Sequence, residues 1–272
     1  MRIEIATIAV LGAGTMGRGI AHVSALAGFS TRLFDVAQDA VDKARTSIEK
    51  NLDKGVELGK VKAEAAAAAK GALTTHVDLA QAVRDADLVI EAIPETMALK
   101  IETFRAVAHA APAHALFASN TSALSITEMA AASGRPERFA GMHFFNPVHV
   151  MKLLELVRGL ETSDDTIAAL TAVGQRMGKE VVLVREAPGF VTTRINALIG
   201  NEAFRMLEQG VAHARNRRRI ALEGVGRHRL PRAGHLPMQC SVGGGRSSAR
   251  SACCTPSSPP APTRSWSPTA WC

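Results

Sequence analysis

Apolar and polar residues alternate in two different rhythms along the first 187 positions of the chain. Short runs rich in β-branched residues are typical of strands, and between them lie stretches with apolar residues at helical spacing. The first unit is a strand at residues 3–10, a helix at residues 15–27 that ends at Gly28, and a second strand at residues 31–36. A chain that repeats this order builds a parallel sheet covered by helices on both faces. The pattern therefore predicts an α/β fold.

The same alternation continues beyond the first unit. Further strands are expected at residues 87–93, 115–119, 139–145, 153–157 and 180–184. Helices are expected between them at residues 97–110, 125–132 and 165–177. Residues 39–70, rich in Ala, Lys and Glu, predict one or two exposed helices broken near Gly55 and Gly59.

The alternation ends at a Pro-Gly pair, Pro188 and Gly189, which precedes an apolar-periodic helix at residues 190–209. We therefore expect a domain of residues 1–187, followed at residues 188–212 by the first helix of an all-helical C-terminal domain. From residue 210 the chain turns to Arg, Ser, Pro and Gly without sustained periodicity. We expect the second domain to be truncated, and residues 213–272 to be an aberrant, disordered tail. The composition of this tail resembles the product of a GC-rich message translated in a shifted reading frame.

Charge divides the chain at the same place. The full chain carries a formal charge of +7, but residues 211–272 hold ten Arg and a single acid, Glu223, so the first 210 residues are slightly acidic. A nucleic-acid site needs an ordered basic surface with stacking aromatics, and the basic tail offers only Trp266 and Trp271. We therefore expect no nucleic-acid partner.

The apolar runs are too short and too interrupted to cross a membrane, and the amino terminus enters a strand without the features of an export signal. All four cysteines lie in the tail, so the body offers no disulfide framework, and we assign no metal ligands. We expect a cytoplasmic protein with no membrane partner.

A glycine motif lies between the first predicted strand and helix. Gly12, Gly14 and Gly17 form G-x-G-x-x-G, in which the first glycine allows a tight turn, the second a close approach to a pyrophosphate, and the third close helix packing. Thr15 and Met16 open the helix whose N terminus would meet the phosphates. This context predicts a Rossmann-type dinucleotide-binding domain.

An acidic residue, Asp35, ends the next strand, 18 residues after Gly17. A carboxylate at this point accepts hydrogen bonds from both ribose hydroxyls of an adenosine and repels a 2′-phosphate. NAD is therefore the expected cofactor. The nearby cation Arg32 weakens this preference for NAD over NADP only slightly.

Two longer strings add to these motifs. Residues 117–122 read FASNTS, residues 139–148 read FAGMHFFNPV, and Pro188-Gly189-Phe190 follows. Together with the glycine motif, they closely resemble the 3-hydroxyacyl-CoA dehydrogenases, including the 3-hydroxybutyryl-CoA members, over about the first 210 residues. The resemblance implies a reversible, NAD-dependent oxidation of an L-3-hydroxyacyl-CoA, expected to be 3-hydroxybutyryl-CoA, to the 3-ketoacyl-CoA in fatty acid metabolism and β-oxidation.

The residues themselves favour the same chemistry. Oxidising a secondary alcohol needs a base for the hydroxyl proton, and His143 at the end of a predicted strand is the natural candidate. A reversal of the chain centred near His149 would place His143 opposite Glu155. Glu155 would then hold the imidazole in one tautomer, as the resembled family's His and Glu do. On pattern alone, Glu155 could also be a solvated strand carboxylate.

Other roles come only from the resemblance. Ser122 is similar to the serine that hydrogen-bonds the substrate oxygen, Asn146 to the amide beside the catalytic His, and Asn120 to a residue along the cofactor. Without the resemblance, such residues in loops most often satisfy local backbone groups.

Four charged residues are carried over in the same way. Glu91 and Lys100 match positions near the nicotinamide half of the cofactor, although both could be ordinary surface charges. Lys50 and Lys54, one helical turn apart, could meet the phosphates of CoA, or could simply be solvated.

The chain departs from the family pattern in two places. Thr193 stands where relatives often carry Asn, and a hydroxyl replaces only part of an amide's hydrogen bonding. The helices that form the family's dimer contact and one wall of its cleft are not recognisable after residue 212, so we expect the dimer contact to be lost. Two alternatives stay open: an NAD-binding protein with impaired catalysis, and a dehydrogenase of another hydroxy acid.

Overall fold

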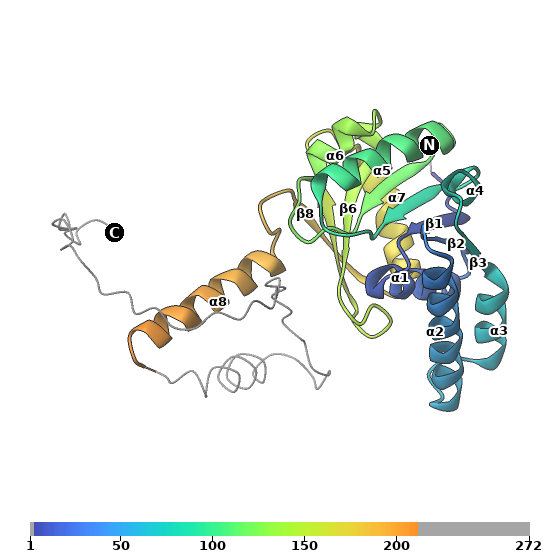
Figure 1. Ribbon diagram of the computed structural model, residues 1–272, viewed down its shortest axis with the longest axis horizontal. Helices are drawn as coiled ribbons and strands as arrows, with labels where there is room; N and C mark the ends of the chain where they lie inside the picture. Colours follow the sequence, from blue (N-terminus) through green and yellow to red (C-terminus); the bar gives the residue numbers. More distant parts are fainter. Residues whose placement is uncertain (1–2, 212–272) are drawn as a thin grey trace, which may run out of the picture. The chain divides into compact units, whose positions relative to one another are not determined.

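A single eight-stranded sheet organises the part of the chain that the structure describes, residues 3–211 of the computed structural model. Its strands are β1 (Thr7–Leu11), β2 (Ser30–Phe34), β3 (Leu73–His76), β4 (Leu88–Glu91), β5 (Leu116–Ser119), β6 (Phe139–Phe144), β7 (Leu153–Arg158) and β8 (Glu180–Arg185). The helices are α1 (Thr15–Leu26), α2 (Gln38–Glu57), α3 (Ala63–Ala72), α4 (Leu79–Val83), α5 (Met97–Ala110), α6 (Ile126–Ala132), α7 (Asp164–Arg176) and α8 (Thr192–Glu208), with a 3-10 turn at Pro136–Arg138. Figure 1 shows their arrangement.

The strand order is β3-β2-β1-β4-β5-β6-β7-β8, and the pairs from β3 to β6 are all parallel. The first six strands thus have the 3-2-1-4-5-6 order of a doubly wound dinucleotide-binding sheet. β7 runs antiparallel to β6, and β8 is parallel to β7. The predicted α/β fold of the Rossmann type is confirmed.

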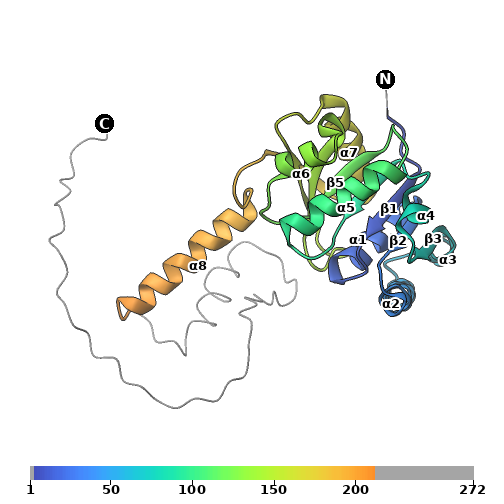
Figure 2. The ribbon, with the colours of Figure 1, turned by 45° about the horizontal axis from the view of Figure 1, so that its top comes forward.

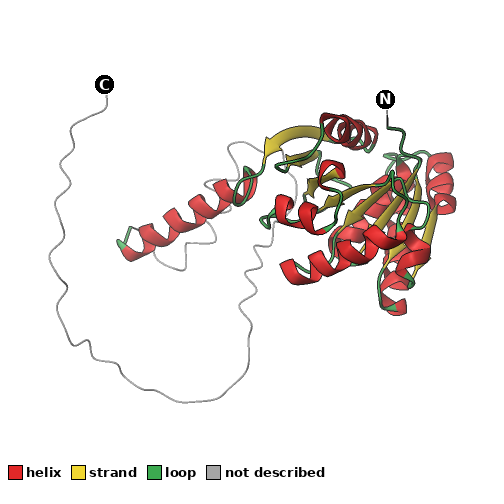
Figure 3. Ribbon diagram, turned by 90° about the horizontal axis from the view of Figure 1, so that it is seen from above, coloured by secondary structure: helices red, strands yellow, loops and turns green. Residues whose placement is uncertain are grey.

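Side chains that alternate along the strands fill two cores, one on each face of the sheet. Ile8 and Val10 of β1 pack with α1, α2, α3 and α7, whereas Ala9 and Leu11 pack with α4, α5 and α6. Figure 2 shows α5 and α6 side by side over one face, and Figure 3 shows the strands between helices on both sides. A strand buried on both faces must be apolar throughout, which is why β1, β4 and β5 read as nearly continuous apolar runs.

The exposed helical stretch at residues 39–70 forms two helices, α2 and α3, which lie side by side (Figure 1). The chain turns at Gly59, whose φ is +65°. The break predicted at Gly55 is wrong, because Gly55 lies within α2. A Cβ there would lie 2.8 Å from Val61 Cγ2, so this glycine makes room for the returning chain.

Three short elements were not predicted from the sequence pattern: β3, α4 and the turn at Pro136–Arg138. β3 is an edge strand of sequence LTTH and carries only one buried residue, Leu73, so its apolar signal is weak. The first strand also starts later than expected, at Thr7.

After residue 187 the described chain continues into α8, and none of the residues of α8 is buried. Ile195 and Leu198 are more than half exposed. Residues 212–272 lie outside the described residues, so the truncated domain, the aberrant tail and the lost dimer contact stay predictions. None of the helices within residues 3–211 combines the length and apolarity that a membrane crossing needs.

Candidate active site

The glycine loop lies between β1 and α1, where the first strand ends. Gly12 has a φ of +98°, and a Cβ there would lie 2.7 Å from the carbonyl oxygen of Ala92. A Cβ on Gly17 would lie 1.7 Å from the carbonyl oxygen of Gly12. Only glycine therefore permits both the turn and the close start of α1, as the motif predicts.

Gly14 differs from the other two glycines because a Cβ there would meet no atom within 4 Å. It precedes α1, whose first residues are the exposed Thr15 and the half-buried Met16. The first turn of a helix carries unpaired amides, and this one has no acidic side chain that would compete for them. The loop thus has space and amide donors for a pyrophosphate.

Asp35 follows β2 and is tied to the glycine loop. Its Oδ2 accepts a hydrogen bond of 2.8 Å from the amide of Ala13, and its Oδ1 accepts one of 3.2 Å from the amide of Ala37. The carboxylate is therefore held beside the loop that would bind the cofactor. Arg32 is engaged elsewhere, because its guanidinium forms a two-point ion pair with Asp85.

A pocket opens beside the glycine loop. It is lined by Met16, Ala92, Ile93, Glu95, Lys100, Asn120, Ser122 and Ala123. Met16, Lys100 and Asn120 of the expected cofactor residues and the expected substrate serine, Ser122, thus line one pocket, although they come from three separate segments of the chain. Ser122 is exposed and lies on the segment after β5.

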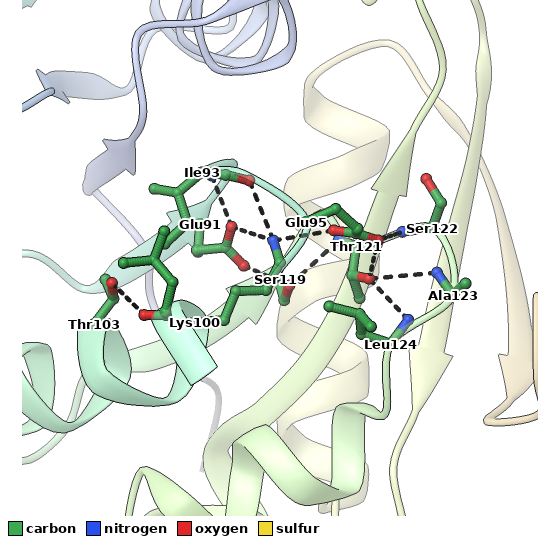
Figure 4. Close-up of polar contacts among 11 residues, drawn as sticks. Glu91, Ile93, Glu95, Lys100, Thr103, Ser119, Thr121, Ser122, Ala123 and Leu124 are labelled. Carbon is green, nitrogen blue, oxygen red and sulfur yellow. Dashed lines mark hydrogen bonds and ion pairs between the residues drawn. The ribbon is translucent and has the colours of Figure 1, made fainter. Parts of the chain in front are cut away.

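Glu91 and Lys100 form a completely buried ion pair, with exposed side-chain fractions of 0% and 1% and a separation of 2.5 Å between Oε1 and Nζ. The amide of Ile93 and the hydroxyl of Ser119 also donate to the Glu91 carboxylate. Figure 4 shows this network. Neither residue is an ordinary surface charge, and Glu91 is not among the residues that line the pocket.

Glu95 also lines the pocket, although no sequence motif pointed to it. Its carboxylate accepts hydrogen bonds from the hydroxyl of Thr121 and, at 2.9 Å, from the amide of Ser122, and it lies 3.2 Å from Lys100 Nζ (Figure 4). It therefore links the buried ion pair to the loop that carries Ser122. Glu95 lies in a bend after Pro94 and outside any periodic pattern, so the sequence carries no signal for its place in the pocket.

His143 and Glu155 are directly opposite each other in the antiparallel pair of β6 and β7. The imidazole Nδ1 lies 2.8 Å from Glu155 Oε2, and the two residues are 6% and 2% exposed. The reversal centred near His149 is therefore confirmed. Because Nδ1 is engaged by the carboxylate, Nε2 is the ring nitrogen left to exchange a proton with a ligand.

Two aromatic rings flank the imidazole. The ring centroids of Phe145 and Phe190 lie 4.6 Å and 5.8 Å from that of His143. Phe190 is buried and has a φ of +48°, which is uncommon for a residue with a side chain. The Pro-Gly-Phe segment thus places an aromatic ring beside the His143–Glu155 pair.

The two asparagines occupy different environments. Asn120 is half-buried, and its Oδ1 accepts a 2.9 Å hydrogen bond from the amide of Phe144, the residue after His143. Asn146 is exposed where the connection between β6 and β7 begins. Lys50 and Lys54 lie apart from this region, on the exposed surface of α2, where Lys50 borders a surface hollow with Thr46.

The start of α8 meets the same carboxylate. The amide of Thr192 donates to Glu155 Oε1 at 2.9 Å, and its hydroxyl donates to Oε2 at 3.1 Å. From the sequence, Thr193 is the candidate polar residue of this segment, whereas the contact to Glu155 is made by its neighbour Thr192. The α8 turn decides which of two adjacent threonines reaches the carboxylate, and the sequence pattern carries no signal for this choice.

Known proteins resemble this chain over most of the described residues. Residues 7–187 match the family described as "3-hydroxyacyl-CoA dehydrogenase, NAD binding domain". A probable 3-hydroxybutyryl-CoA dehydrogenase of Bacillus subtilis is 43% identical over 210 residues, which cover 77% of this chain and 73% of that protein. The mitochondrial hydroxyacyl-coenzyme A dehydrogenase of Sus scrofa is 38% identical over 216 residues, or 78% of this chain and 69% of that protein.

Among solved structures, the (S)-3-hydroxybutyryl-CoA dehydrogenase of Ralstonia eutropha superposes with a TM-score of 0.77 at 37% identity. The match covers 82% of this chain and 78% of that protein. Sequence family, relatives and fold therefore agree over the region that holds the glycine loop and the His143–Glu155 pair. The chain belongs to the 3-hydroxyacyl-CoA dehydrogenase family.

Proposed function

We propose that this chain catalyses the reversible, NAD-dependent oxidation of an L-3-hydroxyacyl-CoA to the 3-ketoacyl-CoA, with 3-hydroxybutyryl-CoA as substrate. The observation that carries the proposal is the buried His143–Glu155 pair in a fold whose glycine loop fits a dinucleotide. The names of the family and of the relatives point to the same reaction.

NAD supplies the hydride acceptor for this reaction. Nε2 of His143 takes the proton of the substrate hydroxyl as the carbonyl forms, and returns it when the reaction runs in reverse. Glu155 fixes the tautomer that leaves Nε2 free to accept the proton, and stabilises the imidazolium that follows. Ser122 donates to the substrate oxygen, and Asn146 supplies an amide beside His143.

The pocket suggests how the cofactor is held. Gly12, Gly14 and Gly17 shape the loop for the pyrophosphate, with Thr15 and Met16 at the N terminus of α1, and Asp35 accepts from the adenosine ribose.

On the nicotinamide side we assign Asn120, Lys100 and Glu95. Lys100 and Glu95 line the pocket, whereas Glu91 is buried beneath it. Glu91 therefore acts on the cofactor through Lys100, which differs from the direct contact that the resemblance implied.

The CoA moiety needs cationic partners for its phosphates, and Lys50 and Lys54 remain our candidates because both are exposed on one face of α2. An acyl-CoA is thus the small-molecule partner. The expected cytoplasmic location follows from the sequence and stays a prediction.

The test is the oxidation of NADH with acetoacetyl-CoA, followed by absorbance. We expect turnover with NADH that exceeds turnover with NADPH, because Asp35 disfavours a 2′-phosphate. His143→Gln should lower kcat by a factor of about 10² to 10⁴ and leave NAD affinity unchanged by calorimetry. Near-parental turnover of His143→Gln would place the base elsewhere, and NAD binding without turnover by the parental chain would favour the alternative of an impaired NAD-binding protein.

A further inference from the structure

Glu155 accepts hydrogen bonds from two directions. On one side lies Nδ1 of His143, and on the other lies Thr192, which donates from its amide to Oε1 and from its hydroxyl to Oε2. The imidazole and the Thr192 hydroxyl therefore share one carboxylate oxygen. With the carboxylate only 2% exposed, these protein donors take the place of water around its charge.

A carboxylate with one partner can rotate about its terminal bond, because that torsion is broad. Donors on both oxygens fix the plane of the carboxylate and hence the direction in which Oε2 meets the imidazole. Thr192 is the first residue of α8, so the helix contributes its N-terminal amide and the positive end of its dipole to the same anion. The contact thus joins Glu155 to the chain beyond the Pro-Gly-Phe segment.

We propose that Thr192 is a positioning residue for the reaction, which holds the Glu155 carboxylate in the orientation that aligns the imidazole of His143. This inference rests on the proposed function of the His143–Glu155 pair. It assigns the role to Thr192 and not to Thr193, whose side chain makes no hydrogen bond to Glu155 in the described chain.

The test compares three variants of the full chain. Thr192→Val keeps the shape of the side chain and the amide donor and removes only the hydroxyl. Thr192→Ser restores a hydroxyl, and Thr193→Val is the matched control on the neighbouring residue. Each is first checked for folding by thermal unfolding and for NAD affinity by calorimetry.

The first readout needs neither cofactor nor turnover. In the chain without NAD, a proton on Nδ1 of His143 that is hydrogen-bonded to a carboxylate gives a downfield NMR resonance. The resonance is assigned to His143 by its absence in His143→Gln. We expect this resonance to weaken or vanish in Thr192→Val and to persist in Thr192→Ser and Thr193→Val.

The second readout is steady-state kinetics. Misalignment of the imidazole should lower kcat in Thr192→Val by about threefold to tenfold, with KM for both substrates nearly unchanged, and Thr192→Ser should recover most of the loss. If Thr192→Val does not fold, Thr192→Ala removes the same hydroxyl and is judged by the same readouts.

A folded Thr192→Val with the parental resonance would overturn the proposal, and so would a parental chain that lacks the resonance. A parental chain that shows the resonance but no turnover would count against the proposed function alone. In that case, the NMR comparison decides the role of Thr192.

Discussion

At the scale of single residues, the site depends on how buried charges are paired. Glu155 has its donors in His143 and Thr192, and Glu91 has its donors in Lys100, Ser119 and the amide of Ile93. A buried carboxylate that keeps its charge needs such partners, because desolvation otherwise costs several kcal/mol. The two carboxylates have different roles, since Glu155 lies next to the proposed base and Glu91 lies beneath the pocket.

Glu155→Gln tests the first of these pairs. The amide is nearly isosteric, but it carries no charge to stabilise an imidazolium, so kcat should fall by about tenfold or more while the thermal unfolding midpoint changes little. The pH dependence of kcat should change shape at the same time. An unaltered pH–rate profile in a folded Glu155→Gln would show that the carboxylate does not act on His143.

Lys100→Met tests the second pair. It leaves the Glu91 carboxylate without its cation at 0% exposure, so the free energy of unfolding should drop by about 3 to 5 kcal/mol. The double variant Glu91→Gln/Lys100→Met removes both charges and should recover much of the loss. The free energy of unfolding of all three chains is measured with urea. Equal free energies for the single and double variants would argue against a strong interaction between Glu91 and Lys100.

At the scale of elements, α1 packs against the connection that joins β6 to β7. His22 of α1 is 5% exposed, its ring stacks on that of His149 at 5.4 Å, and its Nδ1 has no hydrogen-bond partner in the described chain. Lys179 lies nearby and donates to the carbonyl oxygens of Val148 and Met151. Burial, followed by the charges of His149 and Lys179, lowers the pKa of His22 to about 4.

This packing predicts a loss of stability in mild acid. The unfolded chain protonates His22 near pH 6.5, whereas the folded chain keeps it neutral down to about pH 4, so protonation favours unfolding in that window. The contribution of His22 should be about 3 kcal/mol between those limits. His22→Phe keeps a ring at the contact and removes the titration.

Urea unfolding at pH 7, 5.5 and 4 measures the effect. The free energy of unfolding should fall less steeply with decreasing pH in His22→Phe than in the parental chain. His109→Gln, a change at an exposed histidine of α5, is the control and should keep the parental slope. Identical slopes in His22→Phe and the parental chain would mean that this histidine is not the acid-sensitive group.

At the scale of the whole molecule, the groups assigned to the cofactor lie before the Pro-Gly-Phe segment, and groups that contact the proposed base and its carboxylate lie within and after it. The glycine loop connects β1 to α1 and Asp35 directly follows β2, whereas Phe190 and Thr192 contact the His143–Glu155 pair from beyond residue 187. Cofactor binding and alignment of the base therefore depend on different stretches of sequence.

A chain that ends at Ala187 tests this division. NAD affinity by calorimetry should stay close to that of the full chain, because every group assigned to the cofactor is retained. Turnover should fall by about 100-fold, because the imidazole and its carboxylate lose Phe190 and Thr192. Parental turnover in the shortened chain would show that the segment has no part in aligning the base.

Much of this protein follows from the sequence because the relevant contacts are local or set by strand geometry. The glycine spacing fixes the turn, and φ of +98° at Gly12 together with the missing space at Gly17 explains why no other residue serves. The pairing of His143 with Glu155 follows from a reversal at His149, since residues equally distant from the centre of a hairpin meet. The twofold period of a strand then puts both side chains on one face.

Other features needed the tertiary structure. Nothing in the sequence distinguishes Glu95 from Glu91 as a residue that lines the pocket. The burial of each carboxylate depends on which segments after β4 and β5 meet α1 and α5. Thr192 reaches Glu155 only through the turn that starts α8, 37 residues further along the chain. Contacts between segments so far apart depend on how the layers pack, and hydrophobic periodicity records only that a face is buried, not which polar group it meets there.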